Sequence, residues 1–244
     1  MSEALPQLTE AERVKTKVLL RPKDAATLIL LDQSGDVPKV LMGKRHAGHK
    51  FMPGKFVFPG GRTERADYAM NVAGTLPDHV ETRLMAHVTR PSAAKARALA
   101  LAAVRETFEE TGLMLGTREF GAPETTPEGL WAQFGAEGVF PNLENFHFIA
   151  RAITPPQRPK RFDARFFCCD ASEIAHRVDG KIGPDAELTE LVWMPLTQVR
   201  ELDLPTITRI VLDELDKRIA ARMAPYVSVP FFFERYGKWQ RVEL

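Results

Sequence analysis

Two kinds of apolar spacing alternate along the chain and predict interleaved strands and helices. The uninterrupted apolar run from Ala25 to Leu31 is typical of a buried strand, and Val40 to Arg45 is its expected hairpin partner across the turn residues SGDVP. Between Ser92, a typical N-cap, and Gly112, a typical C-cap, the pattern predicts one long helix that ends at Thr111. These elements form the framework into which the rest of the chain must fit.

The remaining predicted elements are shorter. Strands are expected over residues 56–58, 146–153, 165–169 and 191–194, and in the terminal segment from Tyr226, which should turn at Tyr236 and Gly237. Helices are expected near residues 127–134, over 197–202 and 206–223, and in parts of 68–89. Pro59 should end its strand, Gly60 and Gly61 should turn the chain, and a loop-rich stretch should start at Leu115. This interleaving indicates an α/β sandwich built as one domain over residues 1–244, with an insertion at about 68–97 and a C-terminal helix and strands from about 204.

The composition argues against several functions. With 33 Lys and Arg against 32 Asp and Glu, the net charge is +1, so no overall field attracts nucleic acid or a membrane surface. The two cysteines, Cys168 and Cys169, are adjacent and point to opposite faces of a strand, which argues against an ordinary disulfide or a zinc cage. The first residues lack an apolar signal core, and no run approaches the roughly 20 apolar residues of a membrane span, so we expect a cytoplasmic protein.

The segment AAVRETFEETGL, residues 102–113, carries the most chemical information. On a helical wheel, Glu106, Glu109 and Glu110 fall within about 100° of one another. The opposite side of the wheel holds the apolar residues Leu101, Val104 and Phe108. Like charges at this spacing destabilise a helix by a few tenths of a kcal/mol per pair, whereas a divalent cation would make the crowding favourable. Taken alone, a solvated acidic face would explain the three glutamates as well.

The surrounding residues resemble the Nudix box, whose pattern is Gly, five residues, Glu, seven residues, then Arg-Glu-aliphatic-x-Glu-Glu-x-Gly-aliphatic. The second half of the box is matched in order by Arg105, Glu106, Glu109, Glu110, Gly112 and Leu113. The first half begins at the segment Phe58-Pro59-Gly60-Gly61. The resemblance implies a Nudix-type α/β/α sandwich with a mixed sheet. It also implies a Mg²⁺- or Mn²⁺-dependent hydrolase that cleaves a diphosphate bond in a small nucleotide-derived substrate.

The chain departs from this pattern at three places. Thr107 stands where an aliphatic residue is usual. Asp67 stands where the pattern has glutamate after Gly61, and Glu64 competes with it for that role. An insertion, Tyr68 to Arg97, then separates the two halves of the box.

The split box resembles one branch of the Nudix hydrolases in particular. Together with the segments FMPGKFVFPGG, LENFHFIARAITPP and KRFDARFF, it is similar to the branch that includes peroxisomal coenzyme A diphosphatases. The likeness runs from about Ala25 to Leu202 and implies coenzyme A or an acyl derivative as substrate. Two alternatives stay open: a diphosphatase for nucleotide sugars, dinucleoside polyphosphates or NADH, and a non-catalytic Nudix module that binds a nucleotide for regulation.

The resemblance implies roles for the residues of the box. Glu109 and Glu110 should hold the metal ion together with the carbonyl of Gly60. Glu106 should either bind a second ion or activate water, and family members differ on which glutamate is the base. Arg105 is expected to orient the glutamates by ion pairing, because a guanidinium group fits carboxylates well.

Further site residues are expected outside the box. In related proteins a carboxylate usually arrives from the loop before the strand that ends here at Met194, and Glu187 is preferred over Glu190 for that position. The basic residues that precede the box and are candidates for phosphate binding are Arg45, His49 and Lys55. Each of these side chains could equally be an ordinary surface charge.

Three other features have simpler explanations. His147 lies in an aromatic strand and is expected to be a core histidine. The basic run RPKR, residues 158–161, is expected to be a solvated connector rather than a contact to a 3′-phosphate. The aromatic run from Phe231 to Phe233 indicates packing on an edge strand, and a homodimer interface is the alternative.

The insertion between the two halves of the box is expected to be ordered. Its apolar residues recur at roughly helical spacing, which predicts one or two helices; they are Val72, Leu76, Val80, Leu84, Met85 and Val88. Since the insertion interrupts the box, we expect it to lie over the metal face and to form one wall of the substrate pocket. The alternative is an excursion on the surface or at a dimer contact.

Overall fold

A nine-stranded mixed sheet forms the centre of the computed structural model, which describes residues 14–48 and 52–244. Strand β1 (Lys23–Asp32) pairs in parallel with β7 (Phe162–Asp170) and antiparallel with β2 (Lys39–Arg45). The strands run in the order β11-β10-β6-β7-β1-β2-β3, with β4 paired to β1 and β9 paired to β2. The predicted hairpin of β1 and β2 and the mixed sheet are confirmed.

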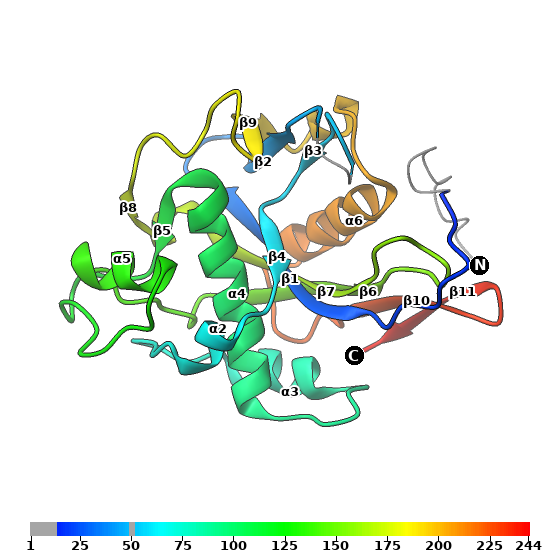
Figure 1. The fold of residues 1–244 in the computed structure, drawn as a ribbon, viewed down its shortest axis with the longest axis horizontal. Coiled ribbons are helices and arrows are strands. Elements are labelled where there is room, and N and C mark those ends of the chain that lie inside the picture. Colours follow the sequence, from blue (N-terminus) through cyan, green and yellow to red (C-terminus); the bar gives the residue numbers. More distant parts are fainter. Residues whose placement is uncertain (1–13, 49–51) are drawn as a thin grey trace.

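The other elements surround these three strands (Figure 1). The remaining strands are β3 (Phe56–Val57), β4 (Gly60–Arg62), β5 (Leu113–Leu115), β6 (His147–Ile153), β8 (Ile174–Arg177), β9 (Leu188–Pro195), β10 (Pro230–Arg235) and β11 (Lys238–Glu243). The helices are α2 (Arg65–Ala69), α3 (Asp78–Met85), α4 (Ala93–Thr111), α5 (Leu130–Ala136) and α6 (Thr206–Ala220), with 3₁₀ turns η1 (Ala171–Glu173) and η2 (Val199–Glu201). Strands β5 and β8 form a separate two-stranded sheet.

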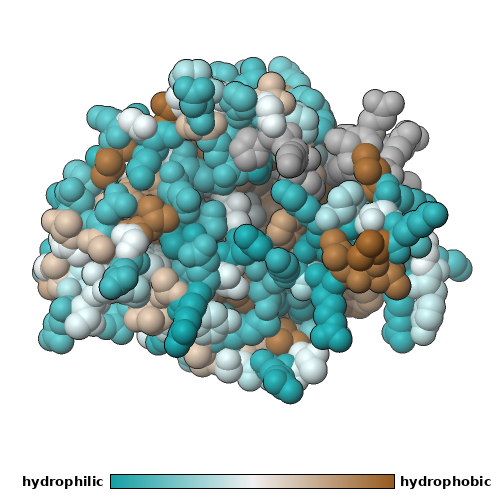
Figure 2. All heavy atoms as spheres, in the orientation of Figure 1, coloured by the Kyte–Doolittle hydropathy of each residue, from teal (hydrophilic) through white to brown (hydrophobic). Residues whose placement is uncertain are grey.

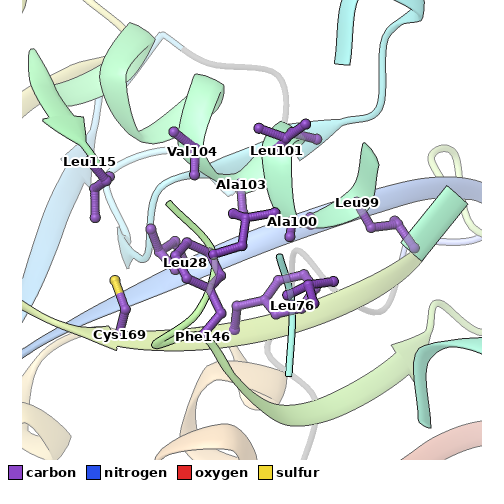
Figure 3. Close-up of a cluster of buried hydrophobic side chains, with 14 of the residues drawn as sticks. Leu28, Leu76, Leu99, Ala100, Leu101, Ala103, Val104, Leu115, Phe146 and Cys169 are labelled. Carbon is purple, nitrogen blue, oxygen red and sulfur yellow. The ribbon is translucent and has the colours of Figure 1, made fainter. Parts of the chain in front are cut away.

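Each face of the sheet is covered by one long helix. Successive residues of β1 point to opposite faces, so Leu28 and Leu30 join the core under α4, while Ile29 and Leu31 join the core under α6. Figure 3 shows Ala100 and Ala103 of α4 lying toward Leu28. Because β1 is buried on both faces, its continuous apolar run is explained, and the expected α/β/α sandwich is confirmed.

Helix α4 begins and ends where its caps predict. The Ser92 side chain accepts a hydrogen bond from the Lys95 N–H at 3.2 Å, and Gly112 adopts the left-handed conformation with φ of +78°. A Cβ atom at Gly112 would lie 2.0 Å from the carbonyl oxygen of Val178. The Val178 N–H donates to the Gly112 carbonyl at 2.8 Å, so the end of α4 is fastened directly to the chain after β8.

Three sequence-based expectations about local structure were wrong, and two short strands were not predicted. Gly60 and Gly61 do not turn the chain but form β4, which pairs with Ala26 and Thr27 of β1. The strands that were not predicted are β5 and β8, since strands this short have almost no periodicity. The expected helix over 197–202 is only the 3₁₀ turn η2, and α6 ends at Ala220 rather than at residue 223.

The aromatic run near the C-terminus does not lie on an edge strand. Strand β10 lies between β6 and β11, so β11 is the edge. Phe231 and Phe232 are 5% and 2% exposed, and Phe233 is half-buried. The proposed aromatic patch is therefore covered within the chain itself.

Among residues 14–48 and 52–244, no helix is both long enough and apolar enough to cross a bilayer. Figure 2 shows a face on which hydrophilic side chains predominate and hydrophobic ones form only small patches.

The end of α4 provides a test of the packing. Gly112→Ala should lower the free energy of unfolding by about 2–4 kcal/mol, because a left-handed alanine is strained and its Cβ meets the Val178 carbonyl. Gly121 is the matched control, since its φ is +71° but nothing lies within 4 Å of an added Cβ. Gly121→Ala should cost only about 1 kcal/mol in denaturant unfolding. Equal losses in the two variants would contradict the proposed contact.

Candidate active site

A buried ion pair joins the two halves of the split box. The Nε of Arg105 donates to Oδ1 of Asp67 at 2.8 Å, and its Nη2 lies 3.2 Å from Oδ2. Asp67 is fully buried and also accepts hydrogen bonds from the Trp131 indole at 3.1 Å and from the Glu64 N–H at 2.7 Å. Of the two acids that compete for this position, Asp67 is thus the buried partner, while Glu64 is the N-cap residue of α2.

Arg105 extends from this pair toward the glutamates. Its Nη1 donates to Glu106 at 3.0 Å and lies 3.5 Å from Glu109, and its Nη2 donates to the Arg62 carbonyl at 2.8 Å. Burial lowers the pKa of Arg105, but the hydrogen bonds and charge of Asp67 outweigh burial, so the pKa is raised overall and the guanidinium stays charged. The expected ion pairing of Arg105 with glutamates is present in the structure.

Glu106 packs tightly against β4. A Cβ atom at Gly61 would lie 2.3 Å from the Glu106 carboxyl carbon, so only glycine leaves room for that carboxylate beside the strand. The pKa of Glu106 is raised to about 7, mainly by burial and also by the Glu109 and Glu187 carboxylates, although Arg105 opposes the shift.

Glu110 is the most deeply buried glutamate of the box, with 5% of the residue exposed. Its Oε2 accepts one long hydrogen bond, 3.3 Å, from the Gly60 N–H. Burial raises the pKa of Glu110 well above its ordinary value, and the charges of Glu187 and Glu106 add to the effect. Glu106 and Glu110 therefore do not belong to the solvated acidic face that was considered from the sequence, whereas the Glu109 side chain is 52% exposed.

Glu187 and Arg45 complete this group from the sheet side. The Arg45 guanidinium forms an ion pair with Glu187, and its charge lowers the pKa of Glu110. The His46 N–H donates to the Glu187 carbonyl at 3.0 Å, which fastens the loop before β9 to the end of β2. Glu190 instead lies 4.0 Å from Lys44, on an exposed part of β9.

The Lys55 side chain has its partner outside this group. Lys55 forms an ion pair with Asp203 at 2.6 Å, so its ammonium is engaged with the segment before α6. His49 lies outside the described residues. His147 lies half-buried in β6, and burial lowers its pKa, as expected of a core histidine.

The basic connector after β6 holds the N-terminal segment. Arg158 donates to the Val14 carbonyl at 3.2 Å, and Arg161 donates to the Leu20 carbonyl at 2.6 Å. These contacts give the RPKR run a structural role beyond that of a solvated connector.

The insertion does not cover the glutamates, contrary to expectation. Val80 and Leu84 of α3 pack in the core beside Ala96 and Leu99, near the start of α4, and the Arg151 side chain donates to the Ala86 carbonyl at 3.0 Å. Figure 1 shows α3 beside this end of α4. The start of α4 is about 25 Å along the helix from its last glutamate. Only the first residues of the insertion, in α2, approach the site; the apolar face of α3 is used for core packing.

The carboxylates fit a magnesium ion in their chemistry. Among the described residues, no three His, Cys, Asp or Glu side chains already form a closed set of metal ligands. Mg²⁺ does not require such a set, because it usually binds one or two carboxylates and completes its shell with water and substrate phosphates. Glu110 is a buried carboxylate whose ionisation is opposed by Glu106 and Glu187, so a bound cation would stabilise its charged form.

The departure at Thr107 is also explained. Thr107 is fully buried, and its hydroxyl donates to the Ala103 carbonyl at 2.7 Å. The polar group is thereby satisfied within α4, so a threonine can occupy a position that is usually aliphatic. Trp131, which holds Asp67, gave no signal in the sequence because it is distant from the box along the chain.

Comparison with known proteins agrees with this fold. A Nudix hydrolase from Alicyclobacillus acidocaldarius is 29% identical, with a TM-score of 0.65 over 86% of this chain and 98% of that one. The Nudix domain of Shewanella oneidensis NrtR in complex with ADP-ribose is 15% identical, with a TM-score of 0.45 over 87% of this chain and 99% of that one. A MutT protein from Bacillus halodurans is 12% identical, with a TM-score of 0.45 over 90% and 97%. No protein-family model and no curated protein matches the sequence.

The Alicyclobacillus structure is the one of these three on which our assignment rests. The mixed sheet between α4 and α6 is the fold of the Nudix hydrolases. With the box glutamates gathered beside β4 on this fold, the chain is an enzyme of the Nudix hydrolase type.

The raised pKa of Glu106 predicts how stability depends on pH in the metal-free protein. The folded state holds the Glu106 proton up to about pH 7, whereas the unfolded state releases it near pH 4.5. The contribution of Glu106 to the free energy of unfolding is therefore fully present below pH 4.5 and is lost as the pH rises through about 7. The loss should be on the order of 2–3 kcal/mol.

Denaturant unfolding of metal-free protein between pH 5 and 8 measures this effect. Glu106→Gln should lose less stability over that interval than wild type, because glutamine does not titrate. Glu190→Gln, at an exposed carboxylate on β9, should keep the wild-type slope. If Glu106→Gln and wild type have the same slope, Glu106 ionises normally.

Proposed function

We propose that this enzyme hydrolyses a diphosphate bond in a nucleoside diphosphate-X substrate with Mg²⁺ or Mn²⁺. The observation that carries the proposal is the crowding of Glu106, Glu110 and Glu187, where burial and mutual repulsion hold the pKa values of Glu106 and Glu110 above normal. A fold gains no stability from such crowding, whereas a divalent cation that links the carboxylates to substrate phosphates makes it favourable. The same argument favours an enzyme over a non-catalytic Nudix module.

Each residue of the group has a distinct task in this proposal. Glu109, Glu110 and the Gly60 carbonyl would hold the metal ion, with Glu106 and Glu187 beside them. When bound, the ion would neutralise diphosphate charge and lower the pKa of attacking water. Arg105 keeps Glu106 and Glu109 in place through ion pairs.

Proton transfer from water and binding of the substrate phosphate involve residues of the same group. Glu106 or Glu109 would accept the proton of the attacking water. Arg45, which ends β2 beside Glu187, would meet a substrate phosphate. Because Arg105 is already bound to Asp67, we assign it to positioning and not to substrate contact.

The proposed substrate is coenzyme A or an acyl derivative. Support comes from the resemblance of the split box to the branch that contains coenzyme A diphosphatases. A nucleotide sugar, a dinucleoside polyphosphate or NADH is the competing class.

The first functional prediction concerns the metal and Glu110. Chelation with EDTA should abolish release of monophosphate products, and Mg²⁺ or Mn²⁺ should restore it. Glu110→Gln should lose at least about two orders of magnitude in kcat with normal folding, the scale expected when a key electrostatic group is removed. Glu190→Gln is the matched control and should stay within about twofold of wild type, because Glu190 pairs with Lys44 at an exposed position.

Two results would contradict the proposal. One is full activity after rigorous chelation. The other is a Glu110→Gln variant with nearly wild-type kcat, which would mean that the buried carboxylate serves folding only.

The second functional prediction concerns the substrate. In a panel with equal concentrations of Mg²⁺, coenzyme A should have the highest kcat/KM and should yield 3′,5′-ADP and 4′-phosphopantetheine. NADH, ADP-ribose and a nucleotide sugar test the competing class. A tenfold higher kcat/KM for any of these would reject coenzyme A and leave the hydrolase assignment intact.

A further inference from the structure

A small apolar recess lies between the β5–β8 sheet and strands β2 and β9. Its volume is about 300 Å³, and it is lined by Leu41, Leu113, Ile174, Arg177, Leu191 and Trp193. Its residues come from β2, β5, β8 and β9. None of them belongs to the box face that holds the glutamates.

The recess is tied to the glutamates through the chain. Leu113 lies three residues after Glu110 and directly follows Gly112, the C-cap of α4. Arg177 pairs with Leu113 across the β5–β8 sheet, and the next residue, Val178, donates its N–H to Gly112. Figure 1 shows β5 and β8 beside this end of α4. One wall of the recess is therefore fixed to the end of the catalytic helix.

The opposite wall continues from Glu187. Strand β9 starts at Leu188, and its residues Leu191 and Trp193 pair with Gly43 and Leu41 of β2. At about 3.4 Å per residue, Leu191 lies roughly 13 Å and Trp193 roughly 20 Å along the strand from Glu187. A ligand whose phosphates meet Arg45 and the carboxylates could place its next group over this strip of sheet.

The lining has the chemistry of a site for a planar base. Trp193, which lines the recess, is 37% exposed to solvent, whereas Trp131, which lies in the core, is 1% exposed. An exposed indole beside aliphatic side chains offers a stacking surface, and the planar guanidinium of Arg177 can stack or donate to ring nitrogens. Apolar walls with a few polar groups are typical of small-molecule sites, and this volume is at the lower end of their range.

A second, larger cavity has a different character. It measures about 520 Å³ and is lined by Pro22, Lys23, Asp24, Arg62, Thr63 and Glu64. Four charged side chains in this lining suit a hydrated, charged group better than a planar apolar one.

We propose that the recess at Trp193 binds the nucleobase of the substrate, with the base stacked on the indole and Arg177 at its edge. This inference rests on the proposed function for the position of the phosphates, and it adds the part of the protein that recognises the nucleoside. Loops and strands between residues 174 and 193 then select the substrate, while the insertion between the halves of the box does not.

Binding of AMP, a base-containing monophosphate, tests the proposal without hydrolysis. Affinities are measured by calorimetry for wild type, Trp193→Leu and Trp239→Leu. Trp239 is the matched control, because it is 36% exposed but lies on the edge strand β11. Trp193→Leu should weaken AMP binding at least about tenfold, the scale of a lost base–aromatic stack, while Trp239→Leu should stay within about twofold. AMP should also quench the fluorescence of the Trp239→Leu variant, which retains Trp193.

Two further ligands make the outcome specific. Ribose 5-phosphate lacks a base, so its affinity should not change in Trp193→Leu. The proposal is overturned if AMP fails to bind wild type, if AMP binds Trp193→Leu as well as wild type, or if ribose 5-phosphate is weakened equally. It is also overturned if Trp193→Leu weakens 4′-phosphopantetheine and not AMP, because the recess would then bind an apolar arm. If wild type binds AMP through Trp193 but hydrolyses none of the diphosphates, the proposed function is rejected and the assignment of the recess as a base site stands.

Discussion

The ion pair between Asp67 and Arg105 holds together a motif that the chain interrupts. Both residues are withdrawn from solvent, and a buried charge is tolerated only when its partner and the surrounding hydrogen bonds compensate for lost water. Here Trp131 and the Glu64 N–H occupy the remaining positions on Asp67, and the Arg62 carbonyl accepts from Arg105. Removal of either partner would leave the other charge uncompensated. This requirement fixes β4 and α2 against α4, and the placement of the glutamates follows from it.

The charges around this pair do not balance. Arg105 is shared by Asp67, Glu106 and Glu109, so little of its charge remains for Glu110. Glu110 and Glu187 meet near Arg45, which already forms an ion pair with Glu187. This excess of carboxylate is unfavourable in isolation, and under the proposed function a bound divalent cation would offset it.

The position of the insertion changes where substrate selection can occur. Its helix α3 packs beside the start of α4 and contributes Val80 and Leu84 to the core. The opposite end of α4 adjoins β5 and β8 through the contact of Gly112 with Val178. Diphosphate chemistry and the proposed base recess therefore meet at the C-terminal end of α4, and the insertion supports the other end.

Local signals in the sequence determined the elements that carry the chemistry. The caps at Ser92 and Gly112 predicted the ends of α4, and the apolar run predicted β1. The spacing of the box predicted which glutamates share a helix face. Each of these features depends only on residues that are neighbours in the sequence. Only tertiary structure decided that Glu110 is buried, that Asp67 rather than Glu64 holds Arg105, and that α3 lies away from the glutamates. Those outcomes depend on contacts between residues far apart in the chain, such as Trp131 with Asp67 and Arg45 with Glu187, which no local pattern encodes.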